Sequence, residues 1–349
     1  MSDDRTAMSA RPLARKIVLG TIVFVATVAL LLGMTALIGS DPVGSATVSP
    51  PPASAVPGTA GASPSPTFSA EASGTPEASE PAASGGPYEI LVGAGDIADC
   101  GRDSDAKTAD LVDAIEGTVF TAGDNAYPIG SSADFRDCYE PTWGRFLART
   151  RPAPGNHDHL TRLDGYLGYF GAAATPEGTV WYSYDLGTWH IIVLDSNCNP
   201  AGGCGPDSKQ GRWLSADLEA SAALCTLAIW HHPRWSSGEH GSNGEVAPFW
   251  RALFDAGADV VVNGHDHDYE RFKPQDPDGR VDQDRGLREF VVGTGGTSLR
   301  SFDTTANNSA LRVAGIHGVI RFELQPAGYG WRFISTTGEL TDSGQGSCH

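Results

Sequence analysis

From residue 88 onward the chain repeats one pattern, in which a short apolar run ends in a small polar cluster that usually contains Gly with Asp, Asn or His. Runs of this length, rich in Val, Ile and Phe, are typical of buried strands. We expect such strands at residues 89–93, 118–121, 224–230, 259–262 and 289–292. A chain built in this way is constrained to a layered α/β domain with its polar clusters at the strand ends.

Helical patterns and turns separate these runs. We expect helices near residues 105–116, 132–148, 210–220 and 246–256. Residues 181–186 and 189–194 form a predicted hairpin joined at Gly187 and Thr188, and two further strands are expected near 319–324 and 331–335. The sequence therefore predicts one folded α/β domain over residues 88–349.

Residues 17–39 form an uncharged, apolar stretch that, as a helix, is long enough to cross the ~30 Å hydrocarbon layer of a bilayer. Four basic residues precede it, and the next one is Arg102, so the positive-inside rule places residues 1–16 in the cytoplasm. A membrane anchor and a cleaved signal peptide are both compatible with this stretch, and its length favours the anchor. Either way, we expect the following domain outside the cytoplasm, held by a single span or secreted.

Residues 40–87 are dominated by Pro, Ala, Ser, Gly and Thr, with Phe68 as the sole aromatic residue. Such a segment cannot bury enough apolar surface to offset the entropy of ordering, so we expect a disordered linker.

Six cysteines occur after this linker, and none lies in a Cys-x-x-Cys pair with zinc-ribbon spacing. In an exported domain, disulfides are the expected state. Cys198 and Cys204 flank a small-residue turn and are expected to pair, whereas the sequence leaves the pairing of the other four open.

The polar clusters contain the residues from which chemistry is expected. In chain order they are Gly95-Asp96, Gly123-Asp124-Asn125-Ala126-Tyr127, Gly155-Asn156-His157-Asp158, His231-His232-Pro233 and Gly264-His265-Asp266-His267. Since ligands gather beyond the carboxyl ends of strands in α/β sheets, we expect these clusters to converge.

Seven of their side chains are candidate metal ligands, offering carboxylate, phenolate, amide oxygen or imidazole: Asp96, Asp124, Tyr127, Asn156, His231, His265 and His267. This set is too large for one tetrahedral zinc ion. It suits two metal ions that share a carboxylate, as in two-metal phosphate-ester hydrolysis.

In their order and spacing, the five clusters resemble those of the metallophosphoesterase superfamily, and Tyr127 in Gly-Asp-x-x-Tyr resembles the purple acid phosphatase branch. The resemblance covers residues 90–271 and continues more weakly to the C-terminus. It implies the calcineurin-like metallophosphoesterase fold, a four-layer α/β/β/α sandwich.

The resemblance also implies roles for the residues. It places the first metal ion, typically Fe(III), on Asp96, Asp124, Tyr127 and His267. It places the second, Fe(II), Zn(II) or Mn(II), on Asp124, Asn156, His231 and His265, with Asp124 bridging and a metal-bound hydroxide as nucleophile. His157 and His240 match histidines that contact phosphate or protonate the leaving group.

Two positions depart from the family pattern. The first cluster continues as Ile97-Ala98 where the family has x-Gly, and Ala228 stands where the fourth has Val. The second departure leaves His231 and His232 as alternative ligands, and the spacing to Pro233 favours His231.

These features predict a hydrolase that acts on small phosphate monoesters, as an acid phosphatase does. The net charge is −18, and residues 88–349 hold 36 acidic against 20 basic side chains, so we expect no nucleic-acid partner. A phosphodiesterase or nucleotidase on the same fold is the nearest rival function, but Ala98 stands where diesterases commonly have His. The same ligand types would also serve a non-catalytic surface metal-binding module or a redox-active di-iron site. The sequence does not define the oligomeric state.

Overall fold

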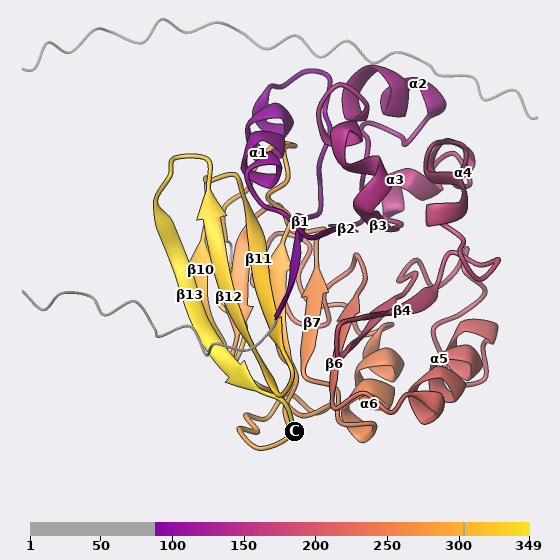
Figure 1. Cartoon of the computed structure of the whole chain (residues 1–349), viewed down its shortest axis with the longest axis vertical. Helices are drawn as coiled ribbons and strands as arrows, with labels where there is room; N and C mark the ends of the chain where they lie inside the picture. Colours follow the sequence, from indigo (N-terminus) through magenta and orange to yellow (C-terminus); the bar gives the residue numbers. More distant parts are fainter. Residues whose placement is uncertain (1–87, 303) are drawn as a thin grey trace, which may run out of the picture. The chain divides into compact units, whose positions relative to one another are not determined.

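The computed structural model describes residues 88–302 and 304–349, and this part of the chain is built on two β-sheets (Figure 1). The six-stranded sheet has the order β13-β12-β11-β1-β2-β3. Its strands are β1 (Glu89–Ala94), β2 (Thr118–Ala122), β3 (Thr150–Ala153), β11 (Gly318–Gln325), β12 (Gly328–Ser335) and β13 (Leu340–Ser347). Within it, β1, β2 and β3 run parallel to one another, so their carboxyl ends lie at the same edge.

The seven-stranded sheet has the order β10-β8-β9-β7-β6-β5-β4. Its strands are β4 (Tyr182–Leu186), β5 (Trp189–Val193), β6 (Cys225–Ile229), β7 (Val260–Asn263), β8 (Tyr269–Phe272), β9 (Arg288–Val292) and β10 (Ser309–Val313). Strands β5, β6, β7 and β9 are parallel neighbours, whereas β4 pairs antiparallel with β5 as the predicted hairpin.

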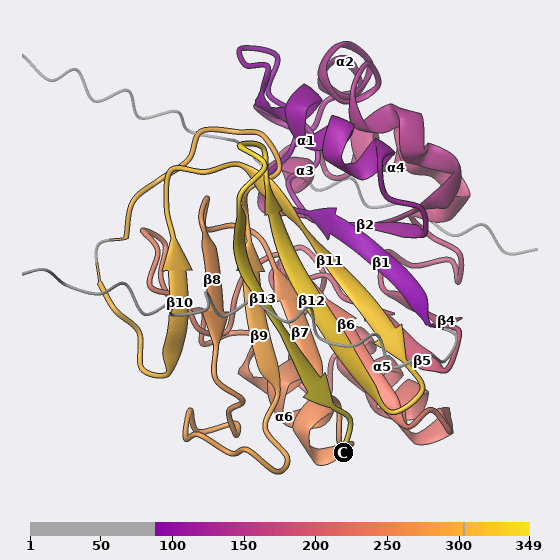
Figure 2. The same cartoon turned by 60° about the vertical axis from the view of Figure 1, so that its left-hand side comes forward.

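Successive side chains along a strand point to opposite faces of the sheet, and in the seven-stranded sheet the side chains on both faces are buried. On β5, Ile191 and Val193 join the main core with residues of the six-stranded sheet, whereas Ile192 packs in a second core beneath α5 (Lys209–Ala220) and α6 (Ala247–Asp255). In Figure 2, β11, β12 and β13 lie in front of β6, β7 and β9.

The remaining helices gather beside β1, β2 and β3 (Figures 1 and 2). They are α1 (Ser104–Asp113), α2 (Ser132–Asp134), the π-helix η1 (Phe135–Tyr139), the 3₁₀-helix η2 (Trp143–Arg149), α3 (Asn156–His159), α4 (Asp164–Phe170) and the 3₁₀-helix η3 (Gly171–Ala173). Helices thus flank both sheets, and the predicted α/β/β/α sandwich is confirmed.

One helix prediction is wrong in detail. The continuous helix expected at 132–148 is instead α2, η1 and η2 in succession. Pro141 accounts for the break between η1 and η2, because it has no amide hydrogen to continue the helical ladder.

Four strands were not predicted. β3 and β8 are only four residues long, β10 has only five residues, and β13 carries few apolar residues, so none shows a recognisable period. These strands form because they pair with neighbouring strands that are distant in the sequence. Such pairing cannot be predicted from the local sequence.

Disulfide bonds pair all six cysteines of the described residues. Cys198 and Cys204 are bonded as predicted, with their Cα atoms 5.0 Å apart. The other bonds join Cys100 to Cys138, between the loop before α1 and η1, and Cys225 to Cys348, between β6 and the C-terminal end.

The predicted cytoplasmic segment 1–16, membrane span 17–39 and linker 40–87 lie outside the described residues. Among the helices of residues 88–302 and 304–349, none is long and apolar enough to cross a membrane.

Candidate metal centre

Each of the five polar clusters follows the carboxyl end of a parallel strand. Asp96 comes after β1, Asp124 after β2 and Asn156 after β3, all in the six-stranded sheet. His231 comes after β6 and His265 after β7, both in the seven-stranded sheet. The amide of His265 donates to Asp96 Oδ2 at 2.7 Å, which ties the two sheets together at this edge. The predicted convergence is therefore present, and both sheets contribute to it.

The backbone at the centre adopts conformations that L-residues rarely occupy. Asp96, Asp124 and His265 have φ angles of 59°, 50° and 72°. Such left-handed residues persist only where the surrounding structure holds them, and they concentrate at functional sites. Here they turn successive side chains off the strand ends into a common space.

Gly155 shows how closely the loops approach one another. A Cβ atom on this residue would lie 2.1 Å from Asp124 Oδ1 and 2.2 Å from the Asp124 amide nitrogen. The absence of a side chain at 155 lets the β3 loop bring the His157 amide against Asp124 Oδ1 and the Asn156 side chain against His231 Nε2.

The first set of candidate ligands surrounds the phenol oxygen of Tyr127. Tyr127 Oη lies 2.8 Å from Asp96 Oδ1, 3.0 Å from Asp124 Oδ2 and 3.2 Å from His267 Nε2. His267 Nε2 is also 3.3 Å from Asp96 Oδ1. All four residues predicted for the first metal ion thus place a donor atom in one small, buried volume.

The second set surrounds His231 Nε2. This nitrogen lies 3.0 Å from Asn156 Oδ1, 3.2 Å from His265 Nδ1 and 3.3 Å from Asp124 Oδ2. The four residues predicted for the second metal ion are therefore also brought together.

Asp124 Oδ2 belongs to both sets, as a bridging carboxylate requires. Donor atoms about 2.1 Å from a common metal ion are separated from one another by roughly 3.0–3.4 Å in octahedral or tetrahedral geometry. The distances within each set have this size, so the arrangement fits two ions without large rearrangement. The donor chemistry also fits, because carboxylate, phenolate, amide oxygen and imidazole suit iron, zinc and manganese.

Hydrogen bonds to the atoms that face away from the centre orient these candidate ligands. His231 Nδ1 is 2.8 Å from the carbonyl oxygen of Ala122, and His267 Nδ1 is 2.6 Å from that of Ser298. A ring nitrogen that donates to a carbonyl leaves the lone pair of Nε2 for a metal ion. Asp124 Oδ1 likewise accepts the His157 amide at 2.8 Å, which leaves Oδ2 facing the centre.

Burial and the facing charges shift the pKa values of the cluster. Burial by itself would raise the pKa of Asp124, but the adjacent His231 outweighs it and holds this pKa below its usual value. Against its own burial, contact with Asp124 raises the pKa of His231 to about 9. Burial, followed by the charges of Asp124 and Asp96, raises the pKa of the Tyr127 phenol well above its ordinary value. Formation of the phenolate therefore requires added positive charge, which a metal ion supplies.

His157 lies at the edge of the centre. Its ring is about one third exposed, its Nδ1 is 2.5 Å from the Pro128 carbonyl oxygen, and its Nε2 is 3.8 Å from Asp124 Oδ2. The carbonyl assigns the proton to Nδ1, so Nε2 is available to a group bound beside Asp124.

His240 also lies at the centre, stacked on His265 with ring centroids 4.3 Å apart. Arg300 Nη1 lies 2.6 Å from His240 Nε2. A guanidinium can only donate, so this nitrogen is unprotonated in the contact. Burial, and then the charge of Arg300, lower the pKa of His240.

Sequence reasoning assigned no role to Arg300, and none to the buried carboxyl of Asp158. Asp158 Oδ2 accepts the Gly155 amide and the Asn125 side-chain amide, both at 2.9 Å, and so ties the β3 loop to the β2 loop. Asp158 could have been singled out from the sequence, because it lies two residues after Asn156 in the same polar cluster. No sequence pattern points to Arg300, because it follows a glycine-rich loop with no recognisable motif.

The glycine-rich loop at residues 293–296 is a strand-end loop with a packing role. It follows β9, where the Gly295 amide donates to the Gly95 carbonyl oxygen at 2.9 Å and Thr294 Oγ1 donates to that of Gly318 at 2.8 Å. The loop packs beneath the Asp96 segment.

Comparison with known proteins agrees with this geometry. A sequence model of the family described as "Calcineurin-like phosphoesterase" matches residues 77–269. Purple acid phosphatase 21 of Arabidopsis thaliana is 30% identical over 214 residues, which cover 54% of this chain and 46% of that protein. Acid phosphatase type 7 of Homo sapiens is 27% identical over 141 residues, covering 35% of this chain and 32% of that protein. The similarity to purple acid phosphatases that the motifs indicate is thereby confirmed.

Among solved structures, the purple acid phosphatase PPD1 from yellow lupin (Lupinus luteus) seeds superimposes with a TM-score of 0.59 at 17% identity. The superposition covers 75% of this chain and 54% of the lupin protein, and it shows a shared fold. The chain spans less than half the length of the two curated phosphatases named above.

Proposed function

Because the chain belongs to the calcineurin-like phosphoesterase family, we propose that it hydrolyses phosphate monoesters at a centre of two metal ions. The observation that carries the proposal is the position of Asp124 Oδ2, 3.0 Å from Tyr127 Oη in one ligand set and 3.3 Å from His231 Nε2 in the other. We assign Fe(III) to the set that contains Tyr127. Fe(II), Zn(II) or Mn(II) is assigned to the set that contains His231.

When bound, the two ions supply Lewis-acid stabilisation of the phosphate oxygens and lower the pKa of a water molecule that attacks phosphorus. The protein holds the ligands in place beforehand. The Ala122 and Ser298 carbonyl oxygens fix two imidazoles, and the His157 amide fixes the Asp124 carboxylate. Such prior orientation lowers the reorganisation needed during the reaction.

The leaving oxygen requires a proton, and the imidazolium form of His157, which carries a proton on Nε2 as well as on Nδ1, is better placed than His240 to provide it. Its Nε2 is available beside Asp124, whereas His240 Nε2 is occupied by Arg300. Because Arg300 keeps His240 neutral at that nitrogen, we assign His240 to the binding of a phosphate oxygen together with Arg300.

Two features favour monoesters over diesters. Ala98 is buried where a diesterase of the superfamily commonly has His, and Tyr127 lies in the first ligand set. We expect faster hydrolysis of p-nitrophenyl phosphate than of bis-p-nitrophenyl phosphate. A consistent preference for the diester would favour the rival function.

Substitution of Asp124 by Asn tests the proposal against a non-catalytic metal-binding module. Asn lacks the negative charge with which a carboxylate bridges two cations. We therefore expect the rate of p-nitrophenyl phosphate hydrolysis to fall by about 1,000-fold or more. Asp110→Asn is the control, since Asp110 is exposed and paired only with Arg145 among the described residues. An unchanged rate in Asp124→Asn, or no hydrolysis by the parent protein after addition of metal ions, would refute the proposal.

We also propose that the catalytic domain lies outside the cytoplasm, either anchored by residues 17–39 or secreted. Disulfide bonds pair every cysteine of the described residues, a state typical of oxidising compartments. Digestion by protease added to intact cells, with a cytoplasmic protein as the control, tests this location. Resistance of the domain until the cells are lysed would contradict it.

A further inference from the structure

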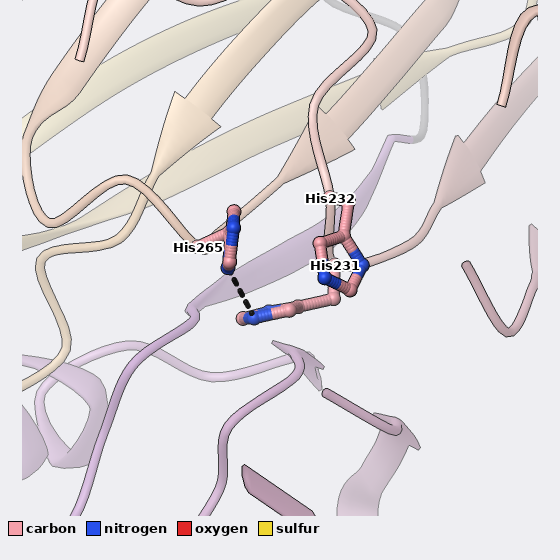
Figure 3. A group of neighbouring side chains, drawn as sticks. All are labelled: His231, His232 and His265. Carbon is pink, nitrogen blue, oxygen red and sulfur yellow. Dashed lines mark hydrogen bonds between the residues drawn. The ribbon is translucent and has the colours of Figure 1, made fainter. Parts of the chain in front are cut away.

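His232 lies beside the second ligand set. The family pattern offered it only as an alternative to His231, and the proposed function assigns it no role. Ligand nitrogens of His231, His232 and His265 all lie within 4.8 Å of one another (Figure 3). The His232 ring centroid is 4.3 Å from that of His265 and 5.0 Å from that of His231. Three imidazoles from the ends of β6 and β7 therefore lie close together beside the second ligand set.

Ser196 holds His232 in this orientation. Its hydroxyl oxygen accepts the His232 amide at 2.9 Å and lies 2.9 Å from His232 Nδ1. With Nδ1–H donated to the hydroxyl, the lone pair of Nε2 is left for another group. A polar partner of this kind behind the ring is the usual companion of a metal-binding histidine.

No hydrogen bond within the described part of the chain is made by His232 Nε2, and the side chain is partly exposed. A purely structural histidine would be expected to use both ring nitrogens for hydrogen bonds or to lie in an apolar core. His190 does the former, with Nδ1 near Asp185 and Nε2 near Asp217. The contrast indicates that His232 is oriented toward a ligand.

We propose that His232 is a further ligand of the second metal ion, which it binds through Nε2 beside His231 and His265. This inference rests on the proposed function, because it concerns the same second metal ion. It gives that ion three imidazoles in addition to the oxygens of Asp124 and Asn156.

The consequence is metal selectivity. Imidazole suits zinc, copper, iron and nickel, whereas carboxylate, carbonyl and water suit manganese, magnesium and calcium. A second position with three imidazoles therefore selects Zn²⁺ over Mn²⁺ more strongly than the ligand set implied by the family resemblance.

The test measures Zn²⁺ and Mn²⁺ affinities of the full chain by competition with a chromophoric chelator. We expect His232→Ala to weaken Zn²⁺ binding at the second position by about 100-fold and Mn²⁺ binding by less than about 10-fold. We expect Ser196→Ala to weaken Zn²⁺ binding by about 10-fold, because it frees the ring without removing it. His317→Ala is the control, since that histidine contacts the Thr294 carbonyl oxygen and belongs to neither ligand set.

X-ray absorption of the zinc-loaded proteins adds a readout that is independent of activity. We expect about three imidazoles at the second ion in the parent protein and about two in His232→Ala. Unchanged Zn²⁺ affinity in His232→Ala, or an unchanged imidazole count, overturns the inference while leaving two-metal hydrolysis intact. A parent protein that binds no second ion and hydrolyses no p-nitrophenyl phosphate overturns the proposed function, and this inference with it.

Discussion

Replacement of Gly155 by Ala is expected to disable the metal centre without unfolding the domain. The new Cβ would lie 2.1 Å from Asp124 Oδ1, whereas ordinary van der Waals contact begins at 3.4 Å. The two groups must therefore separate by the difference between these distances, 1.3 Å. The Asp124 amide nitrogen is 2.2 Å away on the same side, so rotation of the Asp124 side chain alone cannot relieve the clash.

A displacement of this size would move the Asp124 carboxylate and Asn156 away from the ion that they are proposed to share. A misplacement of about 1 Å in a catalytic group costs about 100-fold in rate, so we expect kcat/KM for p-nitrophenyl phosphate to fall by at least that factor. We also expect the purified protein to retain less than its full complement of metal, as measured by elemental analysis.

Gly168→Ala is the matched control. Gly168 lies in α4, and a Cβ there would meet no atom within 4 Å. We expect this variant to keep full activity and to gain up to about 1 kcal/mol in stability, because Ala is the better helix former. Full metal content and activity within threefold of the parent protein in Gly155→Ala would refute the argument that a close approach at this glycine positions Asp124.

Three further predictions concern other parts of the domain. In iron-loaded protein, Tyr127→Phe removes the phenol oxygen from the first ligand set, so a visible charge-transfer band in the parent should vanish; a band that persists would exclude Tyr127 as its source. Although burial opposes protonation of His190, hydrogen bonds to Asp217 and Asp185 outweigh it and raise this pKa. The stabilisation of the fold by protonated His190 is therefore fully present below the ordinary histidine pKa of about 6.5. It is lost as pH rises through the folded-state pKa of His190. Urea unfolding should show His190→Gln to be less stable than the parent by about 1.5–3 kcal/mol near pH 5.5, with a smaller difference near pH 8, and a pH-independent difference would contradict this assignment. Replacement of both Cys100 and Cys138 by Ser opens a loop of 38 residues and should lower the free energy of unfolding by about 3–4 kcal/mol, whereas an unchanged urea midpoint would show that the cross-link does not stabilise the fold.

The layers of the fold were predictable because the strands that bear the site are apolar and end in polar clusters. β1, β2, β6, β7 and β9 all begin and end within two residues of their predicted limits. The edge strand β13 was not predictable, because it reads Leu-Thr-Asp-Ser-Gly-Gln-Gly-Ser and its place is set by pairing with β12.

The sequence identified which side chains come together in the candidate site, but it did not reveal the hydrogen bonds that hold the surrounding side chains in place. Residue type and spacing identified Asp124 and His231, and the structure places them 3.3 Å apart. The contacts of Arg300 with His240 and of Ser196 with His232 join segments that are distant in the sequence, so no local pattern indicates them. Each depends on how loops that follow different strands of the seven-stranded sheet meet.

The most direct test of two-metal hydrolysis is elemental analysis of the purified protein together with its rate of p-nitrophenyl phosphate hydrolysis. We expect about two metal ions per chain, with iron among them, and turnover that disappears when the ions are chelated and returns when they are restored. One ion or none per chain, with no turnover after reconstitution, would contradict the central claim that Asp124 joins two ions into a hydrolytic centre.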